Sequence, residues 1–281
     1  MMWLRFVKMH GLGNDFIVVN ALEEKLPADL NELARRVCHR RFGIGADGLI
    51  IVLPSTQADL RMRIFNPDGS EPEMCGNGIR CFARYVYETG LVREPEIRVE
   101  TLAGIIKPRL ILKEGGVTGV RVDMGEPRLE REKIPMTGSG SPVVDEPVVV
   151  DGGIWRGTCV SMGNPHCVFF IENVAEAPVT TVGPAVENHP LFPQRTNVEF
   201  IEVLNRSELK MRVWERGAGE TMACGTGACA AAVAGVLTGR SNRKVTVHLA
   251  AGDLEIEWSP ENNHVYMTGP AVTVFQGDYP L

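Results

Sequence analysis

The 281-residue sequence lacks several features that would mark a membrane, metal-binding or nucleic-acid-binding protein. It has no apolar run approaching the roughly 18 residues of a membrane-spanning helix, and no CxxC pair of the kind that holds structural zinc. Its net charge of −6 and pI near 5.6 do not provide the basic surface that nucleic-acid binding requires. We therefore expect no metal, no nucleic-acid partner and no membrane partner.

The sequence also lacks a paired cysteine pattern. Its seven cysteines are odd in number and irregularly spaced, and the first residues do not resemble a secretory signal. This usage is typical of free thiols in a reducing compartment, so the sequence predicts a cytoplasmic location. The cysteines are Cys38, Cys75, Cys81, Cys159, Cys167, Cys224 and Cys229.

Two of these cysteines open the same tetrapeptide, CGxG, at Cys75–Gly78 and again at Cys224–Gly227. Each copy leads into a run with helical character, and the copies stand about half the chain apart. Strand-like segments precede and follow each copy. The layout predicts an α+β protein with two structurally similar lobes, each a mostly antiparallel sheet around a central helix.

The lobe boundary is expected near residue 125, where glycines and prolines gather in residues 125–147 and predict a linker. The N-terminal lobe would cover residues 1–124, completed by a C-terminal strand at 269–281, and the second lobe residues 125–268. Strands are expected at 105–112 and 264–275, and a helix over Leu30–Cys38.

The CGxG segments have a structural interpretation and a catalytic one. Free cysteine is commonly a core residue. Glycines beside it, however, leave backbone amides open to a ligand, and a helix N-terminus binds carboxylates and lowers a thiol's pKa. Two such helix starts around one carboxylate would place a thiol on each side of its α-carbon. One thiolate could then remove the α-proton while the other thiol returns one, which inverts configuration.

Further candidates lie at turns and strand ends: Asn14, Asn66, Asn164, His166 and the pair Glu215–Arg216. Each alone is more typical of an ordinary turn residue, a structural histidine or a surface ion pair. Beside two thiols, however, the pair has a second interpretation. The carboxylate of Glu215 could bind the ammonium group of an amino acid, and the guanidinium of Arg216 could bind its carboxylate.

These segments together, in this order, resemble the diaminopimelate epimerase family over nearly the full length. The motifs that carry the resemblance are Lys8–Phe16, Phe65–Ser70, Met74–Cys81, Met162–His166, Thr196–Phe200, Trp214–Gly217 and Ala223–Gly227. The resemblance implies a cofactor-independent isomerase that interconverts LL- and meso-2,6-diaminopimelate, in lysine and peptidoglycan-precursor biosynthesis. The implied partner is this small substrate, and a homodimer stays open.

The resemblance also implies a role for each site residue. Cys75 and Cys224 would be the acid/base pair, with Glu215 and His166 tuning their pKa values. The remaining residues would bind substrate: the amides of Gly76, Asn77, Gly225 and Thr226 at the reacting carboxylate, and Asn14, Asn66, Asn164, Asn197 and Arg216 at the distal end, with Glu215 near the thiols.

One position departs from the family pattern. Some members place a substrate-binding glutamine where this chain has Gly48, so that contact would be lost, replaced by water or supplied elsewhere. Four alternatives remain: a proline racemase-like enzyme of the same fold, an isomerase of phenazine biosynthesis of the same fold, which lacks the thiol pair, a thiol redox protein that links Cys75 to Cys224, and a non-catalytic binding module. Racemases typically carry histidine where Asn77 stands, and the asparagine set has no redox purpose.

Overall fold

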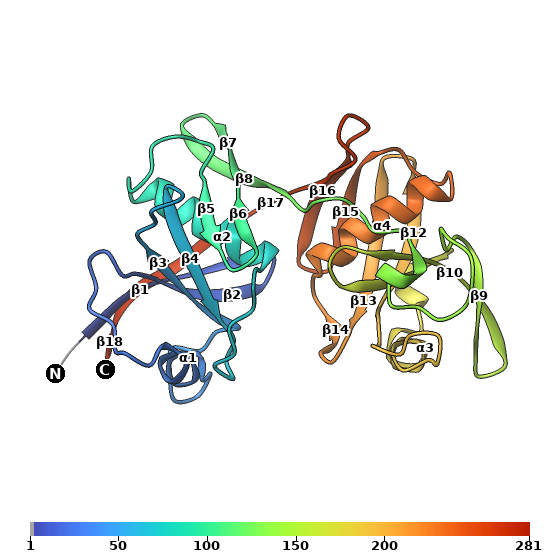
Figure 1. Ribbon diagram of the computed structural model, residues 1–281, viewed down its shortest axis with the longest axis horizontal. Helices are drawn as coiled ribbons and strands as arrows, with labels where there is room; N and C mark the ends of the chain where they lie inside the picture. The colour runs from blue at the N-terminus through green and yellow to red at the C-terminus, as the bar shows by residue number, and fades with distance from the viewer. Residues whose placement is uncertain (1–2) are drawn as a thin grey trace. The chain divides into compact units, whose positions relative to one another are not determined.

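The structure, a computed structural model, describes residues 3–281, which divide into two compact units (Figure 1). Unit 1 comprises the chain up to Asp123 together with Thr268–Leu281, and unit 2 comprises Met124–Met267. Among the helices of this part of the chain, none is both long and apolar enough to cross a bilayer.

Unit 1 alternates strand pairs with helices. Its elements are β1 (Trp3–Gly11), β2 (Asn14–Asn20), α1 (Leu30–Cys38), β3 (Gly48–Leu53), β4 (Leu60–Phe65), α2 (Gly76–Glu88), β5 (Val99–Thr101), β6 (Gly104–Ile106), β7 (Arg109–Lys113), β8 (Gly116–Asp123) and β18 (Val272–Pro280). The sheet order is β18-β1-β2-β3-β4-β5-β6. Its pairs are antiparallel except β2–β3 and β4–β5, whose connections contain α1 and α2.

Unit 2 repeats this order. Its elements are η1 (Arg131–Lys133), β9 (Glu146–Val150), β10 (Gly153–Ser161), β11 (Pro165–Ile171), η2 (Val174–Glu176), α3 (Val179–Glu187), β12 (Asn197–Asn205), β13 (Glu208–Glu215), β14 (Gly219–Thr221), α4 (Gly225–Leu237), β15 (Lys244–Leu249) and β16 (Gly252–Trp258); β17 (Val265–Gly269) crosses the unit boundary. The parallel pairs are β11–β12 and β13–β15, joined through α3 and α4. Both units therefore contain the series β-β-α-β-β-α-β-β, from β1 to β6 in unit 1 and, apart from the short β14, from β10 to β16 in unit 2, which confirms the predicted α+β fold with two similar lobes.

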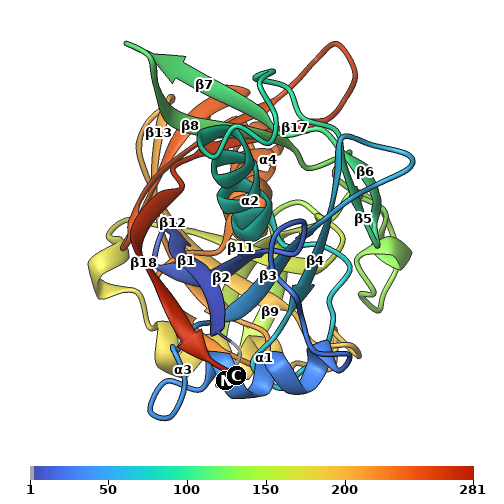
Figure 2. The ribbon, with the colours of Figure 1, turned by 90° about the vertical axis from the view of Figure 1, so that its left-hand side faces the viewer.

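Helices α2 and α4 are the central helices of their units. Helix α2 packs against β1–β4, β7 and β8, and Figure 2 shows it standing among the strands of unit 1. Helix α4 packs against β10–β13, β15 and β16. Each cysteine of the CGxG motif lies at the N-terminal end of such a helix.

The sheet of unit 1 is buried on both faces, which explains the unbroken apolar run of β3. Leu49 and Ile51 join the cluster that includes Leu33 and Val37 of α1. Ile50, between them, points to the other face, where it approaches α2. A Cβ atom added at Gly78 of α2 would lie 3.4 Å from Ile50 Cδ1. One helix therefore covers each face, and the alternation of strand side chains divides the core into two layers.

Helix α4 is built almost wholly from small residues because it is enclosed. Nine consecutive residues, from Gly227 to Gly235, are buried. Alanine and glycine let the surrounding strands approach the helix axis closely. At Gly235 the packing is so tight that a Cβ atom would lie 2.3 Å from Ser241 Oγ.

Three sequence predictions were wrong. The strand expected at 105–112 is two strands, β6 and β7, because Pro108 has no N–H group for the hydrogen bonds between strands. The strand expected at 264–275 breaks at Pro270 for the same reason.

The third wrong prediction is the linker, because residues 125–147 are part of the folded core of unit 2. They bury Ile134, Met136 and Val143 in the core of unit 2, where apolar side chains between the glycines and prolines pack beside Phe169 and Phe200.

We expect Ala231→Leu, in the middle of α4, to destabilise the protein by about 1–3 kcal/mol, because three added carbons have no space in a fully packed core. Urea unfolding followed by circular dichroism measures this loss. Ala175→Leu, at an exposed position of η2, is the matched control and should change the unfolding free energy by less than about 0.5 kcal/mol. Equal stability of the two variants would contradict the close packing of α4.

Candidate active site

Cys75 begins the half-site of unit 1 as the N-cap of α2. Its extended backbone (φ −139°, ψ 120°) precedes Gly76, the first helical residue, and its sulfur accepts a hydrogen bond from the Gly78 amide at 3.4 Å. The first amide that bonds within the helix is that of Ile79, which donates to the Cys75 carbonyl. The amides of Gly76 and Asn77 come before it, so they face out of the helix end with the positive end of its dipole. This arrangement can bind an anion beside the thiol.

Two asparagines flank this thiol. Asn14 Oδ1 accepts from Asn77 Nδ2 at 3.1 Å and lies 3.9 Å from Cys75 Sγ, in position to accept from the S–H group. Asn77 Oδ1 in turn accepts from the guanidinium of Arg80 at 2.8 Å. Because Arg80 is fully buried and also donates to the Pro270 carbonyl, it fixes the orientation of the Asn77 amide.

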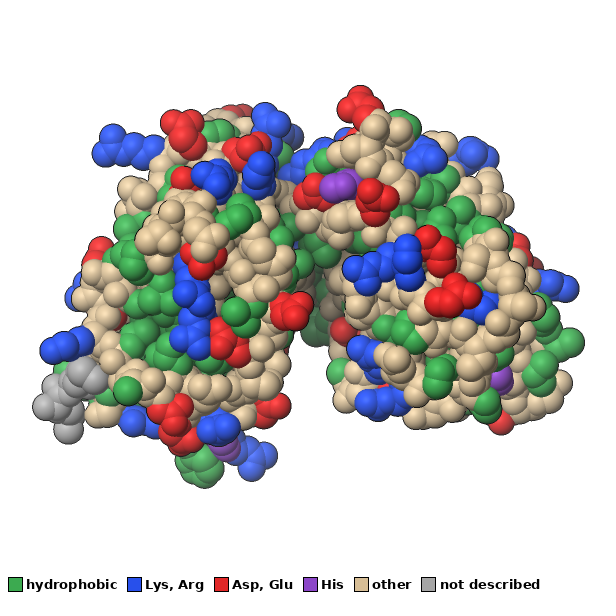
Figure 3. Space-filling view, in the orientation of Figure 1, with side chains coloured by type: hydrophobic (Ala, Val, Ile, Leu, Met, Phe, Trp, Pro, Cys, Tyr) green, Lys and Arg blue, Asp and Glu red, His purple; other side chains and the backbone are tan. Residues whose placement is uncertain are grey.

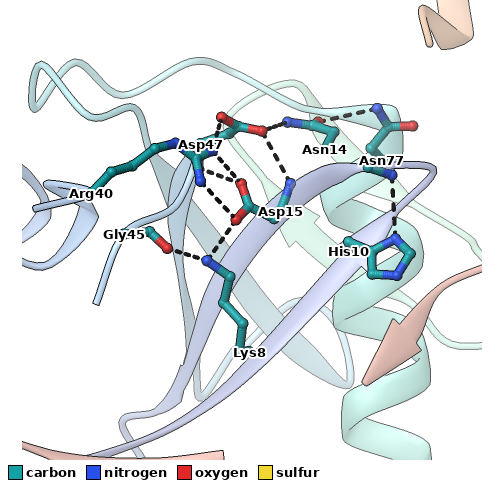
Figure 4. A network of polar contacts seen from close by, with 9 residues as sticks. Lys8, His10, Asn14, Asp15, Arg40, Gly45, Asp47 and Asn77 are labelled. Carbon is teal, nitrogen blue, oxygen red and sulfur yellow. Dashed lines mark hydrogen bonds and ion pairs between the residues drawn. The ribbon is translucent and has the colours of Figure 1, made fainter. Parts of the chain in front are cut away.

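Behind Asn14 lies a network of charged residues (Figure 4). Asn14 Nδ2 donates to Asp47 at 3.0 Å, and Arg40 donates to both Asp47 and Asp15, at 2.6 and 2.7 Å. Lys8, which is buried, pairs with Asp15 at 2.6 Å. Burial by itself would raise the pKa of Asp15, but hydrogen bonds from Arg40 and Lys8 outweigh it and lower that pKa from 3.8 to about 2.

Cys224 begins the half-site of unit 2 in the same way. It is the N-cap of α4, and its sulfur accepts from the Gly227 amide at 3.4 Å. The hydroxyl of Thr226 lies 3.5 Å from the sulfur. The amides of Gly225 and Thr226 correspond to those of Gly76 and Asn77 in unit 1.

The prediction that the helix N-terminus lowers the thiol pKa is wrong for Cys224. Burial raises the pKa of this thiol well above its usual range, and the carboxyl groups of Glu215 and Glu199 raise it further. Hydrogen bonds from Thr226 and the Gly227 amide act in the opposite direction but are the weaker effect. Desolvation of the thiolate in an apolar environment therefore outweighs the helix end.

A line of polar side chains leads from Cys224 into the core. Asn164 Nδ2 donates to Thr226 Oγ1 at 3.3 Å, and Asn164 Oδ1 lies 3.0 Å from His166 Nε2. His166 Nδ1 is 2.7 Å from Glu199 Oε1, and both side chains are fully buried. The structure thus brings the predicted residues Asn164, His166 and Thr226 to one thiol.

Asn197 and Arg216 form a second contact group in unit 2. Asn197 Oδ1 accepts from the Arg216 amide at 2.9 Å, and its Nδ2 donates to the Pro165 carbonyl at 2.8 Å. The exposed Arg216 guanidinium donates to the Gln194 carbonyl. Glu215 accepts from the Thr221 hydroxyl, so neighbouring Glu215 and Arg216 bond different partners.

Unit 1 therefore carries Asn14, Asn66, Cys75, Gly76 and Asn77, and unit 2 carries the other predicted site residues. Asn66 bonds within its own turn, donating to the Ser70 hydroxyl at 2.9 Å.

Position 48 is tightly packed. A Cβ atom at Gly48 would lie 3.0 Å from the Phe65 carbonyl and 3.2 Å from the ring of Phe16, so a glutamine would need its neighbours to move.

Sequence reasoning missed Glu199, Asp47 and Arg80. The signal at Glu199 was present: an acidic residue interrupts an apolar run in Asn197–Ile201, a segment that is buried from end to end. A carboxylate at such a position needs a partner in the core. Asp47 stands in a glycine-containing segment and Arg80 between Ile79 and Cys81. Their contacts depend on tertiary structure.

Comparison with known proteins identifies the family. A family model described as diaminopimelate epimerase matches residues 6–130 and 158–274. The chain is 82% identical over 278 residues to a diaminopimelate epimerase of Moorella thermoacetica, covering 99% of this chain and 100% of that one. The chain belongs to the diaminopimelate epimerase family. A diaminopimelate epimerase of Pelotomaculum thermopropionicum is 63% identical, with 99% of each chain covered.

Solved structures of lower identity share the fold. A phenazine biosynthesis protein of the PhzF family from Bacillus anthracis has a TM-score of 0.72 at 18% identity and covers 100% of both chains. A hydroxyproline epimerase from Agrobacterium vitis has a TM-score of 0.69 at 16% identity, covering 99% of this chain and 93% of that chain. These likenesses extend the fold beyond the diaminopimelate epimerase family.

The visible surface of the units shows charge of both signs. In Figure 3, basic and acidic side chains are interspersed over the face of each unit. This face has no continuous basic patch of the kind that follows a nucleic-acid backbone.

We expect Asp15→Asn to lower the unfolding free energy at pH 7 by roughly 2 kcal/mol, because Lys8 and Arg40 lose a half-buried ionised partner. Since the folded pKa of Asp15 is about 2 and the unfolded one near 3.8, its contribution is present above pH 4 and disappears as pH falls towards 2. Urea unfolding at pH 7 and pH 2.5 should show that the difference in unfolding free energy between Asp15→Asn and the native protein is smaller at pH 2.5. Asp278→Asn, at an exposed ion pair, is the control, and an equal effect there would contradict the assignment.

Proposed function

We propose that this protein is a cofactor-independent isomerase that interconverts LL- and meso-2,6-diaminopimelate, in the biosynthesis of lysine and of peptidoglycan precursors. The observation that carries the proposal is the repeated helix start, in which a cysteine N-cap and flanking glycines open the buried central helix of each unit. The proposed substrate is inferred from membership of the diaminopimelate epimerase family.

In this proposal Cys75 and Cys224 are the acid/base pair. The thiolate of one cysteine removes the α-hydrogen as a proton, and the electron pair of the C–H bond stays on the α-carbon. The thiol of the other cysteine delivers a proton to the opposite face. The first cysteine ends as a thiol and the second as a thiolate, so the reverse reaction uses the same pair with exchanged roles and needs no oxidant or reductant.

The carbanion requires charge stabilisation, which the helix ends can supply. The amides of Gly76, Asn77, Gly225 and Thr226 would hold the carboxylate of the reacting centre, where negative charge accumulates as the proton leaves. The raised pKa of Cys224 keeps this residue as a thiol without substrate, so little of the thiolate that acts as the base is present. The ammonium group of bound substrate would offset the nearby carboxylates and favour the thiolate.

The distal amino-acid end would be read by Asn14, Asn66, Asn164, Asn197 and Arg216. Arg216 suits a carboxylate because its guanidinium is exposed and its backbone is held by Asn197. We also propose a cytoplasmic location, which the irregularly spaced cysteines support. A homodimer stays a prediction.

We expect the purified protein to convert LL- into meso-diaminopimelate in deuterated water with deuterium entering the α-position. Cys75→Ser and Cys224→Ser should each lower kcat by on the order of 10²–10⁴-fold, because a hydroxyl is far less acidic than a thiol. Chiral chromatography and mass spectrometry measure both effects.

Cys81→Ala and Cys229→Ala, at buried positions later in the same helices, are the matched controls and should retain most activity. A Cys75→Ser or Cys224→Ser protein with near-native turnover would refute the two-base scheme. Absence of deuterium incorporation by the native protein would instead favour a redox or binding function.

We expect Arg216→Ala to raise KM and to lower kcat/KM by about 10–100-fold, the cost of one hydrogen bond to a charged group. Lysine, which lacks the second carboxylate, should be a poor substrate for the native protein, and Arg216→Ala should reduce the preference for diaminopimelate. Steady-state kinetics with both amino acids provide the measurement. Arg206→Ala removes an equally exposed arginine of unit 2 and should leave the preference unchanged; similar losses in both variants would contradict the role of Arg216.

A further inference from the structure

Glu199 is a fully buried carboxyl group that the proposed reaction does not use. It lies in β12 and under the first turn of α4, where a Cβ atom at Gly227 would be 2.7 Å from its Oε1 atom. Nothing in residues 3–281 offers a hydrogen bond to its Oε2 atom. A buried carboxylate with one oxygen unsatisfied is strongly disfavoured, so this environment favours a proton on or beside Glu199.

Glu199 is the inner end of a line of contacts that reaches Cys224. The line runs through His166 at 2.7 Å, Asn164 at 3.0 Å and Thr226 at 3.3 Å, and ends at Cys224 Sγ, 3.5 Å from the Thr226 hydroxyl. His166, Asn164 and Thr226 each contact one neighbour towards Glu199 and one towards Cys224. Because each of these side chains has a limited set of donors and acceptors, the direction of one hydrogen bond determines the direction of the next.

Two directions are chemically consistent. If His166 carries hydrogen on Nε2, Asn164 accepts through Oδ1 and donates through Nδ2 to Thr226, whose own hydrogen is then available to Cys224. If His166 Nε2 is unprotonated, the Asn164 amide must turn round and Thr226 donates to Asn164 instead. Cys224 would then lose its side-chain donor.

The proton count of the Glu199–His166 pair selects between these directions. With the extra proton, the pair is either a neutral Glu199 donating to Nδ1 or a charged His166 beside a carboxylate, and both carry hydrogen on Nε2. Without it, a neutral His166 donates from Nδ1 to Glu199 and leaves Nε2 bare. Burial raises the pKa of Glu199, although His166 acts in the opposite sense, which supports retention of the proton.

We propose that Glu199 is a positioning residue: the proton it shares with His166 orients Asn164 and Thr226 so that the Thr226 hydroxyl donates to Cys224 Sγ. That bond is strongest when the sulfur is a thiolate, the form that removes a proton from substrate. Glu199 acts through three intervening side chains and touches no substrate. The proposal rests on the proposed function of Cys224 as an acid/base.

The test compares two replacements of Glu199. Glu199→Gln keeps an N–H donor for His166 Nδ1, whereas Glu199→Leu keeps the approximate volume but has no donor. We expect Glu199→Leu to lower kcat by about 10–100-fold with little change in KM, because nothing then fixes hydrogen on His166 Nε2 and the thiolate loses its hydrogen bond from Thr226. Cys224 alkylation by iodoacetamide should move to higher pH. The Glu199–His166 pair with its shared proton has no net charge, so the replacement does not also remove a negative charge that raises the pKa of Cys224; a shift to lower pH would show that Glu199 is an unshared carboxylate and would overturn the proposal. Glu199→Gln should largely rescue both properties. Glu202→Leu, three residues along the same strand, is the matched control and should change neither.

Native kcat and an unchanged alkylation profile in Glu199→Leu would overturn the proposal, as would Glu199→Gln behaving as poorly as Glu199→Leu. The ¹⁵N chemical shifts of the His166 ring in the unmutated protein report directly whether Nε2 is protonated. This measurement does not depend on whether a variant folds. We expect a protonated Nε2, and a bare Nε2 would overturn the proposal. Alkylation and ring shifts do not depend on turnover, so they test Glu199 even if Cys224 proves dispensable for epimerisation.

Discussion

The hydrogen bond between a cysteine sulfur and the amide three residues later caps the central helix of each unit, around which the strands pack. A helix enclosed by strands must satisfy the donors of its first turn, and Cys75 and Cys224 do so for Gly78 and Gly227. The same bond places a thiol beside outward-facing amides. The structural requirement of a buried helix and the chemical requirement of an anion-binding thiol site are thus met by one residue in each unit.

The two units use one scaffold but surround their thiols differently. In unit 1 the neighbours of Cys75 are amides, held in orientation by charged residues, Asp47 on one side and Arg80 on the other. In unit 2 the line behind Cys224 ends at a buried histidine and carboxyl. Because these neighbours differ, the duplicated fold places its two cysteines in chemically unequal surroundings.

Local signals in the sequence identified much of this arrangement. The helix starts at Cys75 and Cys224 were predictable because a capping residue and its glycines are adjacent in sequence. The contact of Glu199 with His166 was not, because it depends on the parallel register of β11 and β12, which sets His166 opposite Asn197. The raised pKa of Cys224 was missed for a related reason: a helix N-terminus is visible in sequence, whereas the degree of its burial is a property of the assembled unit.

The last strand of the chain has a consequence for biosynthesis. Strand β18 pairs with β1 along its length, setting Pro280 opposite Trp3, while all of unit 2 is encoded between them. As the chain leaves the ribosome, unit 2 therefore has all of its residues available before unit 1 does, and the edge of β1 is open until β18 has been synthesised. Domains usually complete their folding in N-to-C order during translation. In this chain the unit that contains the N-terminal strand is the one that must wait for its final strand, and the open edge of β1 is a site where nascent chains can mispair until β18 is available.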